Sequence, residues 1–490
     1  MIHLIPTPKK YHVAEDTICT IDCKIYTAED NWKEYCEAFS GTFYKLHEVK
    51  PEISMGGIEL VKDVTLAAGS YTIHCGTENP NKENSNGFIK ITASDAEGIL
   101  YGLASLIQLT DFAKGQIVAP QMHIEDYPEK DYRALMVDLG REWHPYSKLL
   151  KYIDICFLYK IKYLHLHFAD SKLYTLPSKA FPKLALPHKS YTYEQISELN
   201  AYAKERGIIL IPEYECPGHA PILVRNYPDV FGNRFEENVS SDFCDEHGTI
   251  IGAEHLMCAG SEACFEANKV LLKEMSDLFP DAPYIHIGGD EANIKLWNYC
   301  SDCKKYMAEH NISDVYELYS EFVGRIAEYV ISLGKTPIVW EGFPEKGVNR
   351  IPKDTIVIGW ESLYHMPDKL IEEGFRVINA SWQPLYVVPR LMRRWNAFDI
   401  LKWNVYNWQN WLPRSAAHLN PITVAPTDQV LGAMLCAWEQ TFEREISFVM
   451  ENLAAMSERT WSVKRVCSDE EFTPKLQRLL ARTEKIIQDK

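Results

Sequence analysis

The 490-residue sequence is short of basic side chains: 51 Lys and Arg stand against 68 Asp and Glu, giving a net charge of -17. A chain with this excess of negative charge repels phosphate backbones and anionic lipid surfaces at long range. We therefore expect neither nucleic acid nor a membrane surface as a partner.

Targeting and membrane segments are also missing. The first ten residues contain no basic region followed by an apolar stretch, and no run of 18 apolar residues occurs later. The thirteen cysteines are an odd number and are scattered along the chain. That distribution is more typical of reduced thiols than of a disulfide framework, so we expect a cytoplasmic protein.

Fingerprints of bound cofactors are absent as well. No GxGxxG sequence opens a helix after a strand, and no GxxxxGK[ST] sequence occurs, which argues against dinucleotide and P-loop nucleotide sites. The close pair Cys300 and Cys303 has no second pair beside it. Such a pair indicates thiols with a structural or incidental role. Zinc binding or redox chemistry stays open as the alternative. We expect no cofactor and no metal ion.

The length and the 46% of hydrophobic residues predict at least two domains, each with its own core. Residues 1–130 read as a smaller α+β domain. Residues 86–92 alternate like a half-exposed strand, and Ser94 and Glu97 are spaced as the capping box of a helix that continues through Leu109. Residues 443–490 show helical spacing and are expected to pack on the preceding domain.

Short apolar runs separated by helical stretches fill residues 131–442, which is typical of βα units around a parallel sheet. Eight runs occur, at residues 134–139, 163–168, 208–212, 284–287, 336–340, 355–358, 376–378 and 433–438. Helices are expected over residues 147–158, 193–206 and 315–332. Eight such units close into a (β/α)8 TIM barrel, whose chemistry lies at the carboxyl ends of the strands. The fold class is therefore α/β.

Acids and Trp recur where these runs end. The residues are Asp138, Arg141, Asp170, Glu213, Glu215, Asp290, Glu291, Trp340, Glu341, Trp360, Glu361, Ser381, Trp382, Trp438 and Glu439. Any one of them could be a satisfied polar residue or a helix cap. Their recurrence at strand after strand predicts one acidic pocket with Trp walls, and flat aromatic faces suit the apolar faces of sugar rings.

Two adjacent carboxylates, Asp290 and Glu291, follow Gly288 and Gly289 at the end of the fourth run. Neighbouring carboxylates repel, so we expect one of them to hold its proton at neutral pH. A neutral acid beside an ionised one can act as a general acid with an electrostatic partner. The simpler interpretation is a strand end whose acids cap the next helix.

Carboxylates with Trp and no cofactor fingerprint indicate glycoside hydrolysis. Two acids adjacent in sequence are poorly placed to flank a glycosidic bond as nucleophile and proton donor. The alternative is a substrate that supplies its own nucleophile, such as a neighbouring acetamide, which the first acid orients.

The segment His286-Ile-Gly-Gly-Asp-Glu291 resembles the signature of glycoside hydrolase family 20, the β-N-acetylhexosaminidases. The similarity extends over nearly the whole chain, beginning with Ile5-Pro-Thr-Pro8 and the small N-terminal domain. Within the barrel it includes Asp138-Leu-Gly-Arg141, His165-Leu-His-Phe-Ala-Asp170 and Pro212-Glu-Tyr-Glu-Cys-Pro-Gly-His219.

The resemblance implies an exo-acting, retaining enzyme that removes terminal N-acetylhexosamine from a glycan through a cyclic oxazolinium intermediate. Glu291 would protonate the departing oxygen, and Asp290 would orient the acetamide. Tyr386 is the expected partner of the acetamide oxygen, with Tyr406 as the fallback. The remaining substrate-binding residues that it implies are Asp138, Arg141, Asp170, His219, Trp340, Trp360 and Trp438.

The chain departs from the family pattern at positions that bind outer hydroxyls. Val388 stands where many members have an acid, Gln440 where a Glu is usual, and Ser171 where a second acid is frequent. The gluco or galacto preference therefore stays open, and a non-catalytic or weakly active amino-sugar-binding protein is the alternative. In that case Trp360, Tyr386 and His219 could be ordinary packing residues.

Two other classes are considered. A nucleotide cyclase also carries Gly-Gly-Asp-Glu, but there an aromatic follows in a hairpin, whereas Ala292 follows here. A zinc hydrolase would use His165, His167 and His219. Finally, the Trp-rich segment 382–425 is expected to form a lid or outer sugar-binding wall, or else to pack its aromatics on the barrel.

Overall fold

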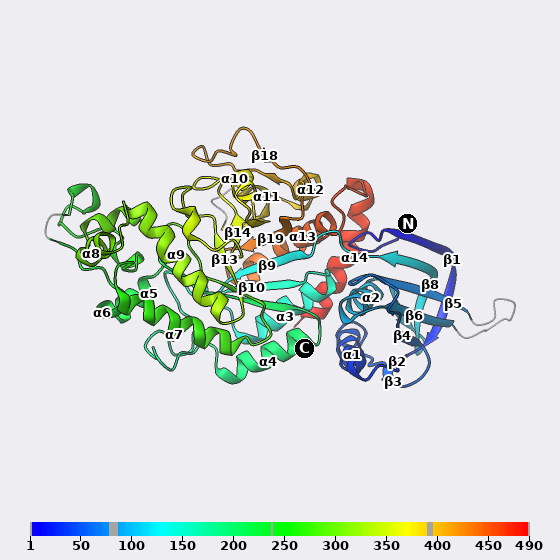
Figure 1. Ribbon diagram of the computed structural model, residues 1–490. Coiled ribbons are helices and arrows are strands. Elements are labelled where there is room, and N and C mark those ends of the chain that lie inside the picture. The colour runs from blue at the N-terminus through cyan, green and yellow to red at the C-terminus, as the bar shows by residue number, and fades with distance from the viewer. Residues whose placement is uncertain (1, 78–86, 237–238, 390–394, 489–490) are drawn as a thin grey trace.

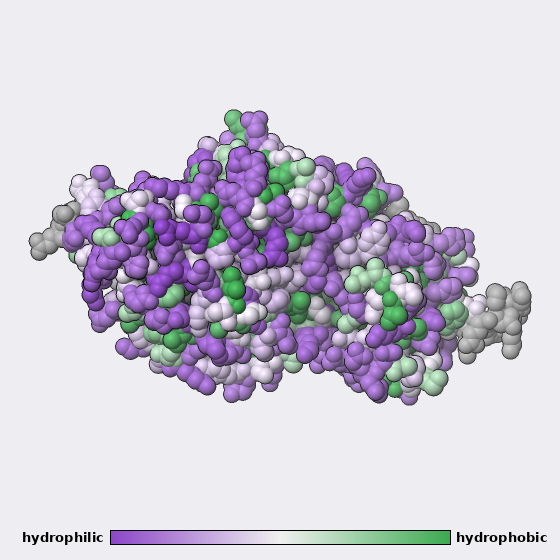
Figure 2. Space-filling model, viewed as in Figure 1, coloured by the Kyte–Doolittle hydropathy of each residue, from purple (hydrophilic) through white to green (hydrophobic). Residues whose placement is uncertain are grey.

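The computed structural model describes residues 2–77, 87–236, 239–389 and 395–488. A mixed sheet occupies the N-terminal part, and a closed parallel barrel follows it (Figure 1). No helix among these residues is long and apolar enough to cross a membrane. The face shown in Figure 2 is largely hydrophilic, with small separated hydrophobic areas.

The N-terminal sheet has the order β1-β8-β5-β6-β4-β2-β3, and β7 pairs with β8. Its strands are β1 (Lys10–Asp22), β2 (Lys24–Thr27), β3 (Glu52–Ile53), β4 (Ile58–Lys62), β5 (Tyr71–Thr77), β6 (Gly87–Ala93), β7 (Asp111–Ala113) and β8 (Gln116–Asp126). Two α-helices, α1 (Lys33–His47) and α2 (Ala96–Leu109), and the short η1 (Asp30–Trp32) join them. Helix α2 contacts the sheet, α1 and α3, which explains why almost all of its residues are apolar and buried.

The predicted capping box of α2 is wrong by one position. Asp95 is the N-cap, and its carboxylate accepts a hydrogen bond from the backbone N–H of Gly98 at 2.9 Å. Ser94 instead donates to the carbonyl of Ala67, and Glu97 accepts from the hydroxyl of Tyr101. Asp is as good an N-cap as Ser, so the two candidates could not be ranked by residue type.

The eight predicted barrel strands are all present. They are β9 (Tyr132–Asp138), β10 (Tyr163–His167), β11 (Ile209–Glu213), β12 (Tyr284–His286), β13 (Thr336–Trp340), β14 (Ile356–Gly359), β15 (Arg376–Asn379) and β19 (Val430–Ala437). Each pairs in parallel with the next, and β19 closes the ring by pairing with both β15 and β9. The predicted (β/α)8 architecture is confirmed.

Helices surround the barrel (Figure 1). They are α3 (Tyr146–Leu158), α4 (Tyr193–Lys204), α5 (Pro221–Asn226), α6 (Pro228–Phe231), α7 (Glu262–Leu278), α8 (Ser301–Glu309), α9 (Val315–Ser332), α10 (Pro367–Glu372), α11 (Trp382–Leu385), α12 (Ala397–Lys402) and α13 (Phe442–Trp461). Connections carry β16 (Tyr386–Val387), β17 (Asn407–Trp408), β18 (Ile422–Thr423), η2 (Ser241–Phe243), η3 (Ala253–His255), η4 (Ile294–Tyr299) and η5 (Val348–Arg350).

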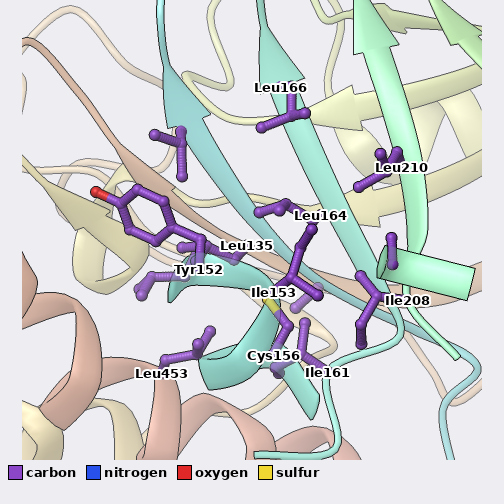
Figure 3. Close-up of a cluster of buried hydrophobic side chains, with 14 of the residues drawn as sticks. Leu135, Tyr152, Ile153, Cys156, Ile161, Leu164, Leu166, Ile208, Leu210 and Leu453 are labelled. Atoms are coloured by element: carbon purple, nitrogen blue, oxygen red, sulfur yellow. The ribbon is translucent and has the colours of Figure 1, made fainter. Parts of the chain in front are cut away.

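Apolar side chains from strands and helices form the core between the barrel and its outer layer. Figure 3 shows Leu164 of β10 beside Ile153 of α3, with Leu166 farther along the same strand, and all three are buried. Every residue of β9 and β10 is buried because the barrel interior covers one face and helices cover the other.

The last helix, α14 (Asp469–Ile487), contacts α1 and α2 of the N-terminal domain as well as α3 of the barrel. Between the two sheets, the buried ammonium of Lys160 lies 2.7 Å from the hydroxyl of Tyr71 and 3.4 Å from the carboxylate of Asp126. A buried charge held by partners across the boundary fixes the N-terminal domain against the barrel.

Candidate active site

The two adjacent acids follow β12, where the backbone makes a tight turn. Gly288 and Gly289 have φ values of 73° and 101°, which favour glycine. A Cβ atom on Gly288 would also lie 2.0 Å from the carboxylate of Glu215. Glu291 itself has φ 47°, a conformation that costs a non-glycine residue roughly 1–3 kcal/mol and is concentrated at functional sites. The turn therefore fixes where the two carboxylates point.

A cavity of about 280 Å³ opens at this end of the barrel. Its lining residues are Arg141, Asp290, Glu291, Trp340, Trp360, Trp382, Tyr386, Val388, Pro389, Trp438 and Glu439. Seven of the ten predicted site residues are among them, drawn from six segments of the chain. The other three, Asp138, Asp170 and His219, contact lining residues from behind. The predicted acidic, Trp-walled pocket is present.

Aromatic rings form the walls of this cavity. Trp360 and Tyr386 are nearly parallel, with an interplanar angle of 9°, and Trp340 meets Trp360 edge-on at 69°. Trp438 lies 5.9 Å from Trp340 and 6.2 Å from Tyr386 between ring centroids. All four rings are at least nine-tenths buried, which gives a dry pocket with flat apolar faces.

Arg141 is held by carboxylates on one side of the cavity. Its guanidinium lies 2.9 Å from Asp170 Oδ2, 3.8 Å from Asp138 Oδ2 and 3.6 Å from Glu439 Oε1. It also lies over the ring of Trp438 at 4.9 Å. Burial alone would lower the pKa of Arg141, but Asp170 and Asp138 raise it above its ordinary value. The side chain is a fixed positive charge that donates into the cavity.

His219 connects Asp170 to the two acids. Its Nδ1 lies 3.3 Å from Asp170 Oδ1, and its Nε2 lies 3.6 Å from Asp290 Oδ2 and 3.4 Å from Glu291 Oε2. Against the effect of burial, Asp290 and Asp170 raise the pKa of His219 well above its ordinary value. The alternative of a core histidine satisfied by a backbone carbonyl is therefore wrong: this imidazolium organises three carboxylates.

The pKa values of two carboxyls at the site shift in opposite directions. His219, whose Nε2 lies 3.4 Å from Glu291 Oε2, lowers the pKa of Glu291 below its ordinary value in the free protein. Burial, together with the charges of Asp290 and Glu213, raises the pKa of Glu215 well above its ordinary value. Glu215 lies beneath the turn and gives the cluster its neutral carboxyl, so the repulsion between neighbouring acids is relieved at a third residue.

Glu213 is the centre of a buried network that we did not assign to the site. One of its carboxylate oxygens accepts a hydrogen bond from Trp340 Nε1 at 2.6 Å, and the carboxylate also contacts the rings of three histidines. Those contacts are with His286 Nδ1 at 2.9 Å, His165 Nε2 at 2.9 Å and His167 Nδ1 at 2.5 Å. Glu213 thereby orients the residues at the floor of the cavity. In the sequence, its position at the end of β11 was the sign that it could take part in the site.

The same network extends to Asp170 and Arg141 beside the cavity. His167 Nε2 lies 2.9 Å from Asp170 Oδ2, which in turn pairs with Arg141. Against burial, Glu213 and Asp170 raise the pKa of His167 well above its ordinary value, and the histidines hold that of Glu213 well below its own. Positive and negative side chains alternate from the barrel interior to the edge of the cavity. Their mutual attraction holds Arg141 and His219 in place.

Two matched substitutions separate these buried carboxyls. Glu213→Gln removes one of the two carboxylates that pair with the His167 imidazolium, Asp170 being the other, and is expected to lower the free energy of unfolding by about 3–5 kcal/mol. Glu215→Gln replaces a neutral acid by a neutral amide of the same shape, so a loss of only about 1 kcal/mol is expected. Urea unfolding at neutral pH measures both. Equal losses of stability in the two variants would contradict the assignment of Glu213 as ionised and Glu215 as neutral.

The three histidines of the zinc-hydrolase alternative do not converge on one metal position. His165 and His167 pair with Glu213, whereas His219 pairs with Asp170. His219, Asp290 and Glu291 do present ligand atoms within 4.8 Å of one another. The other two histidines pair with carboxylates of the Glu213 network instead of lying beside this group.

In the Trp-rich segment after β15, some Trp side chains lie at the cavity wall and others pack in the core. Trp382 lines the cavity, and Trp411 meets it edge-on. Trp408 is fully buried and donates its indole N–H to the carbonyl of Gly359 at 3.1 Å, so the predicted lid role is wrong for this residue. Residues 390–394 of the segment lie outside the described residues.

The fallback Tyr406 does not line the cavity. Its ring faces the ammonium of Lys130 at 4.8 Å, and Lys130 donates to the carbonyl of Val430 where β19 begins. That is the opposite end of the barrel from the acids. Tyr386 is thus the one of the two candidate tyrosines that lines the cavity together with Asp290, while its role in holding the acetamide remains a prediction.

A second cavity, of about 330 Å³, lies between the N-terminal domain and the amino ends of the barrel strands. Its lining includes Leu100, Lys160 and Ile208. Barrel enzymes carry their chemistry at the carboxyl ends, and the acids are there, so we assign the site to the smaller cavity.

Comparison with known sequences gives a consistent match. Residues 131–464 match the catalytic domain of glycosyl hydrolase family 20. The chain is 28% identical over 397 residues to a β-hexosaminidase subunit beta of Entamoeba histolytica, covering 78% of this chain and 68% of that protein. It is 32% identical over 316 residues to a β-hexosaminidase of Akkermansia muciniphila, covering 61% of this chain and 62% of that protein.

Solved structures show the same fold. A β-N-acetylhexosaminidase from Bacteroides fragilis aligns with a TM-score of 0.77 at 24% identity, covering 98% of this chain and 96% of that chain. A family 20 exo-β-N-acetylglucosaminidase from Vibrio harveyi, in complex with N-acetylglucosamine, aligns with a TM-score of 0.82 at 22% identity, covering 99% and 77%. The chain belongs to glycosyl hydrolase family 20 and is a glycoside hydrolase of the β-hexosaminidase type.

Proposed function

We propose that the chain is an exo-acting, retaining β-N-acetylhexosaminidase that uses the acetamide of its own substrate as nucleophile. The observation that carries the proposal is the placement of Asp290 and Glu291 on one wall of the cavity, joined through His219. Glu439, the other carboxylate of the lining, lies 3.6 Å from Arg141. This arrangement supports one proton donor and one orienting acid, rather than two acids that flank the bond.

Asp290 is equipped to orient an amide. Its Oδ2 faces His219, while its Oδ1 is buried and has no hydrogen-bond partner among the described residues. That oxygen would accept the N–H of a 2-acetamido group, pushing the amide oxygen toward the anomeric carbon. The C1–O bond to the aglycone breaks as the amide oxygen bonds to C1, giving an oxazolinium ion that the carboxylate of Asp290 stabilises.

Glu291 would supply the proton for the departing oxygen. Its side chain is 45% exposed in the free protein, and His219 keeps its pKa low. A sugar that fills the cavity removes water from this carboxyl, and desolvation raises the pKa of a carboxylic acid. After the aglycone leaves, the same carboxylate would take a proton from the water that opens the oxazolinium, so that two inversions at C1 retain its configuration.

The cavity supports an exo mode of action. A volume of about 280 Å³ with aromatic walls suits a single terminal sugar rather than a run of them. Arg141 and Glu439 are the charged groups beside Trp438 that can bind the outer hydroxyls. The apolar Val388 lines the same side, and which hydroxyl configuration this set prefers is a question for the assay.

The test is a panel of nitrophenyl glycosides with and without the 2-acetamido group. We expect hydrolysis of the N-acetylglucosaminide or N-acetylgalactosaminide and at least about 10³-fold slower cleavage of the matching glucoside, because the nucleophile is then missing. Proton NMR of the first product should show the β anomer. Equal rates on the glucoside would refute substrate assistance.

Binding of N-acetylhexosamine without turnover would favour the alternative, a non-catalytic amino-sugar-binding protein. The observation behind that alternative is the replacement of two expected acids by Val388 and Gln440. A thiazoline that mimics the oxazolinium separates the two functions, because tight inhibition requires an active site built for that ring.

We also propose that the protein works in a reducing, cytoplasmic compartment. All thirteen cysteines are free, and eleven of them are buried. Cys258 lies 3.7 Å from Cys300 between sulfur atoms without forming a bond. Mass analysis of thiols alkylated in intact cells would test this proposal, and a disulfide found there would contradict it.

A further inference from the structure

Three buried cysteines meet away from the cavity. Cys258 follows η3, Cys300 ends η4, and Cys303 lies in the first turn of α8. The sulfur of Cys258 is 3.7 Å from that of Cys300 and 3.8 Å from that of Cys303. All three side chains are fully buried. The cluster lies at the end of the molecule near α8, far from the N-terminal domain (Figure 1).

These separations fit a metal better than a covalent bond. A disulfide joins its sulfur atoms at about 2.05 Å. Thiolates bound to zinc at about 2.3 Å in a tetrahedron have their sulfur atoms about 3.8 Å apart. The distances of 3.7 and 3.8 Å match the edges of that tetrahedron, and all three sulfur atoms lie within 4.8 Å of one another.

Backbone N–H groups point at the sulfur atoms. Gly260 donates to Cys258, while Arg234 and Cys303 donate to Cys300. The thiolate is the form that binds metal, and hydrogen bonds of this kind orient metal ligands.

The chain approaches closely to bring the three sulfur atoms together. A Cβ atom on Gly260 would lie 2.5 Å from the carbonyl oxygen of Asp302 and from the Cα of Cys303. Only glycine allows this contact between the Cys258 loop and the start of α8.

We propose that Cys258, Cys300 and Cys303 bind one structural zinc ion. Thiolate ligands select zinc among the common divalent metals, and three of them with a fourth ligand such as water complete a tetrahedron. The site is separate from the hydrolytic chemistry, and its existence does not depend on the proposed function.

The ion would join the two loops that carry His219 and Glu291. The first loop runs from Pro217 to Cys258, where the backbone N–H of Met257 donates to the carbonyl of Pro217 at 2.8 Å. The second runs from Glu291 to Cys303, and Trp297 of this loop donates its indole N–H to the carbonyl of Met257 at 2.9 Å. Zinc at the cysteines would hold the His219 loop against the acid-bearing loop.

Metal analysis of the purified full chain tests the site. We expect about one zinc ion per chain for the native sequence, and loss of that zinc in Cys258→Ala. Cys156→Ala is the matched control, because Cys156 is equally buried, lies in α3, and should leave the zinc content unchanged. Zinc retained in Cys258→Ala, or lost equally in both variants, would overturn the proposal.

A second measurement avoids variants that fail to fold. The native chain produced with Co²⁺ in place of Zn²⁺ should show the thiolate-to-cobalt charge-transfer band and the intense visible bands of tetrahedral cobalt. Metal removal by a chelator should lower the melting temperature, and zinc should restore it. A native chain that contains no zinc and gives only the spectrum of hydrated cobalt would overturn the site even if the enzyme hydrolyses its substrate normally.

Discussion

Asp290→Asn is expected to lower kcat about 10²–10³-fold on N-acetylhexosaminides, whatever the leaving group. The amide side chain keeps the shape of Asp290 but removes the negative charge that stabilises the oxazolinium. It also presents N–H donors to an acetamide that itself donates. Because both effects act on the nucleophile, the loss in kcat should be as large for a good leaving group as for a poor one. Steady-state kinetics with nitrophenyl and simple alkyl aglycones measure the loss.

The control for Asp290→Asn is a test that the variant still folds and binds. Asp290 pairs with His219 at 3.6 Å, so the melting temperature and the affinity for N-acetylhexosamine should be compared with those of the native chain. A folded Asp290→Asn protein with native rates on an activated glycoside would refute the role proposed for this acid. A folded variant that loses kcat while keeping its affinity for the product would support it.

The barrel could be predicted because its signals are local. Each strand is a short apolar run, and the acids and Trp at the strand ends mark one edge of the sheet. The turn after β12 could likewise be anticipated from Gly288 and Gly289, and at Gly288 any side chain would clash with Glu215. Seven predicted residues line the cavity for this reason.

Charge states could not be predicted, because they depend on partners far apart in sequence. The expectation of a protonated acid considered Asp290 and Glu291 but not Glu215, whose pKa is raised. Glu215 takes the proton because Glu213 and Asp290 surround it, and His219 keeps Glu291 ionised. Sequence spacing alone does not show that three elements bring these groups together.

The cysteine cluster was missed for a similar reason. Cys300 and Cys303 were visible as a pair, but the third ligand, Cys258, comes 42 positions before Cys300. A single CxxC pair is common without a metal, and only the folded chain shows that a third sulfur completes the triangle. The expectation of no metal ion is therefore the one that the zinc measurement would revise.

Glu291→Gln should produce a loss that depends on the leaving group. Without its proton, hydrolysis of alkyl aglycones is expected to fall about 10²–10⁴-fold, whereas nitrophenolates depart largely unaided and should lose much less in the first step. The contrast with Asp290→Asn is the diagnostic feature, since two acids adjacent in sequence would then give two different dependences on the aglycone.

The pH profile carries the second part of this prediction. Glu291 donates only when protonated, so the rate on alkyl aglycones should fall as the pH rises through its pKa, and that limb should vanish in Glu291→Gln. His219 lowers this pKa in the free protein, and bound sugar should raise it by excluding water. The basic limb of kcat should therefore lie at higher pH than that of kcat/KM. Coincident limbs would mean that the sugar does not desolvate Glu291, and that the proton comes from another group.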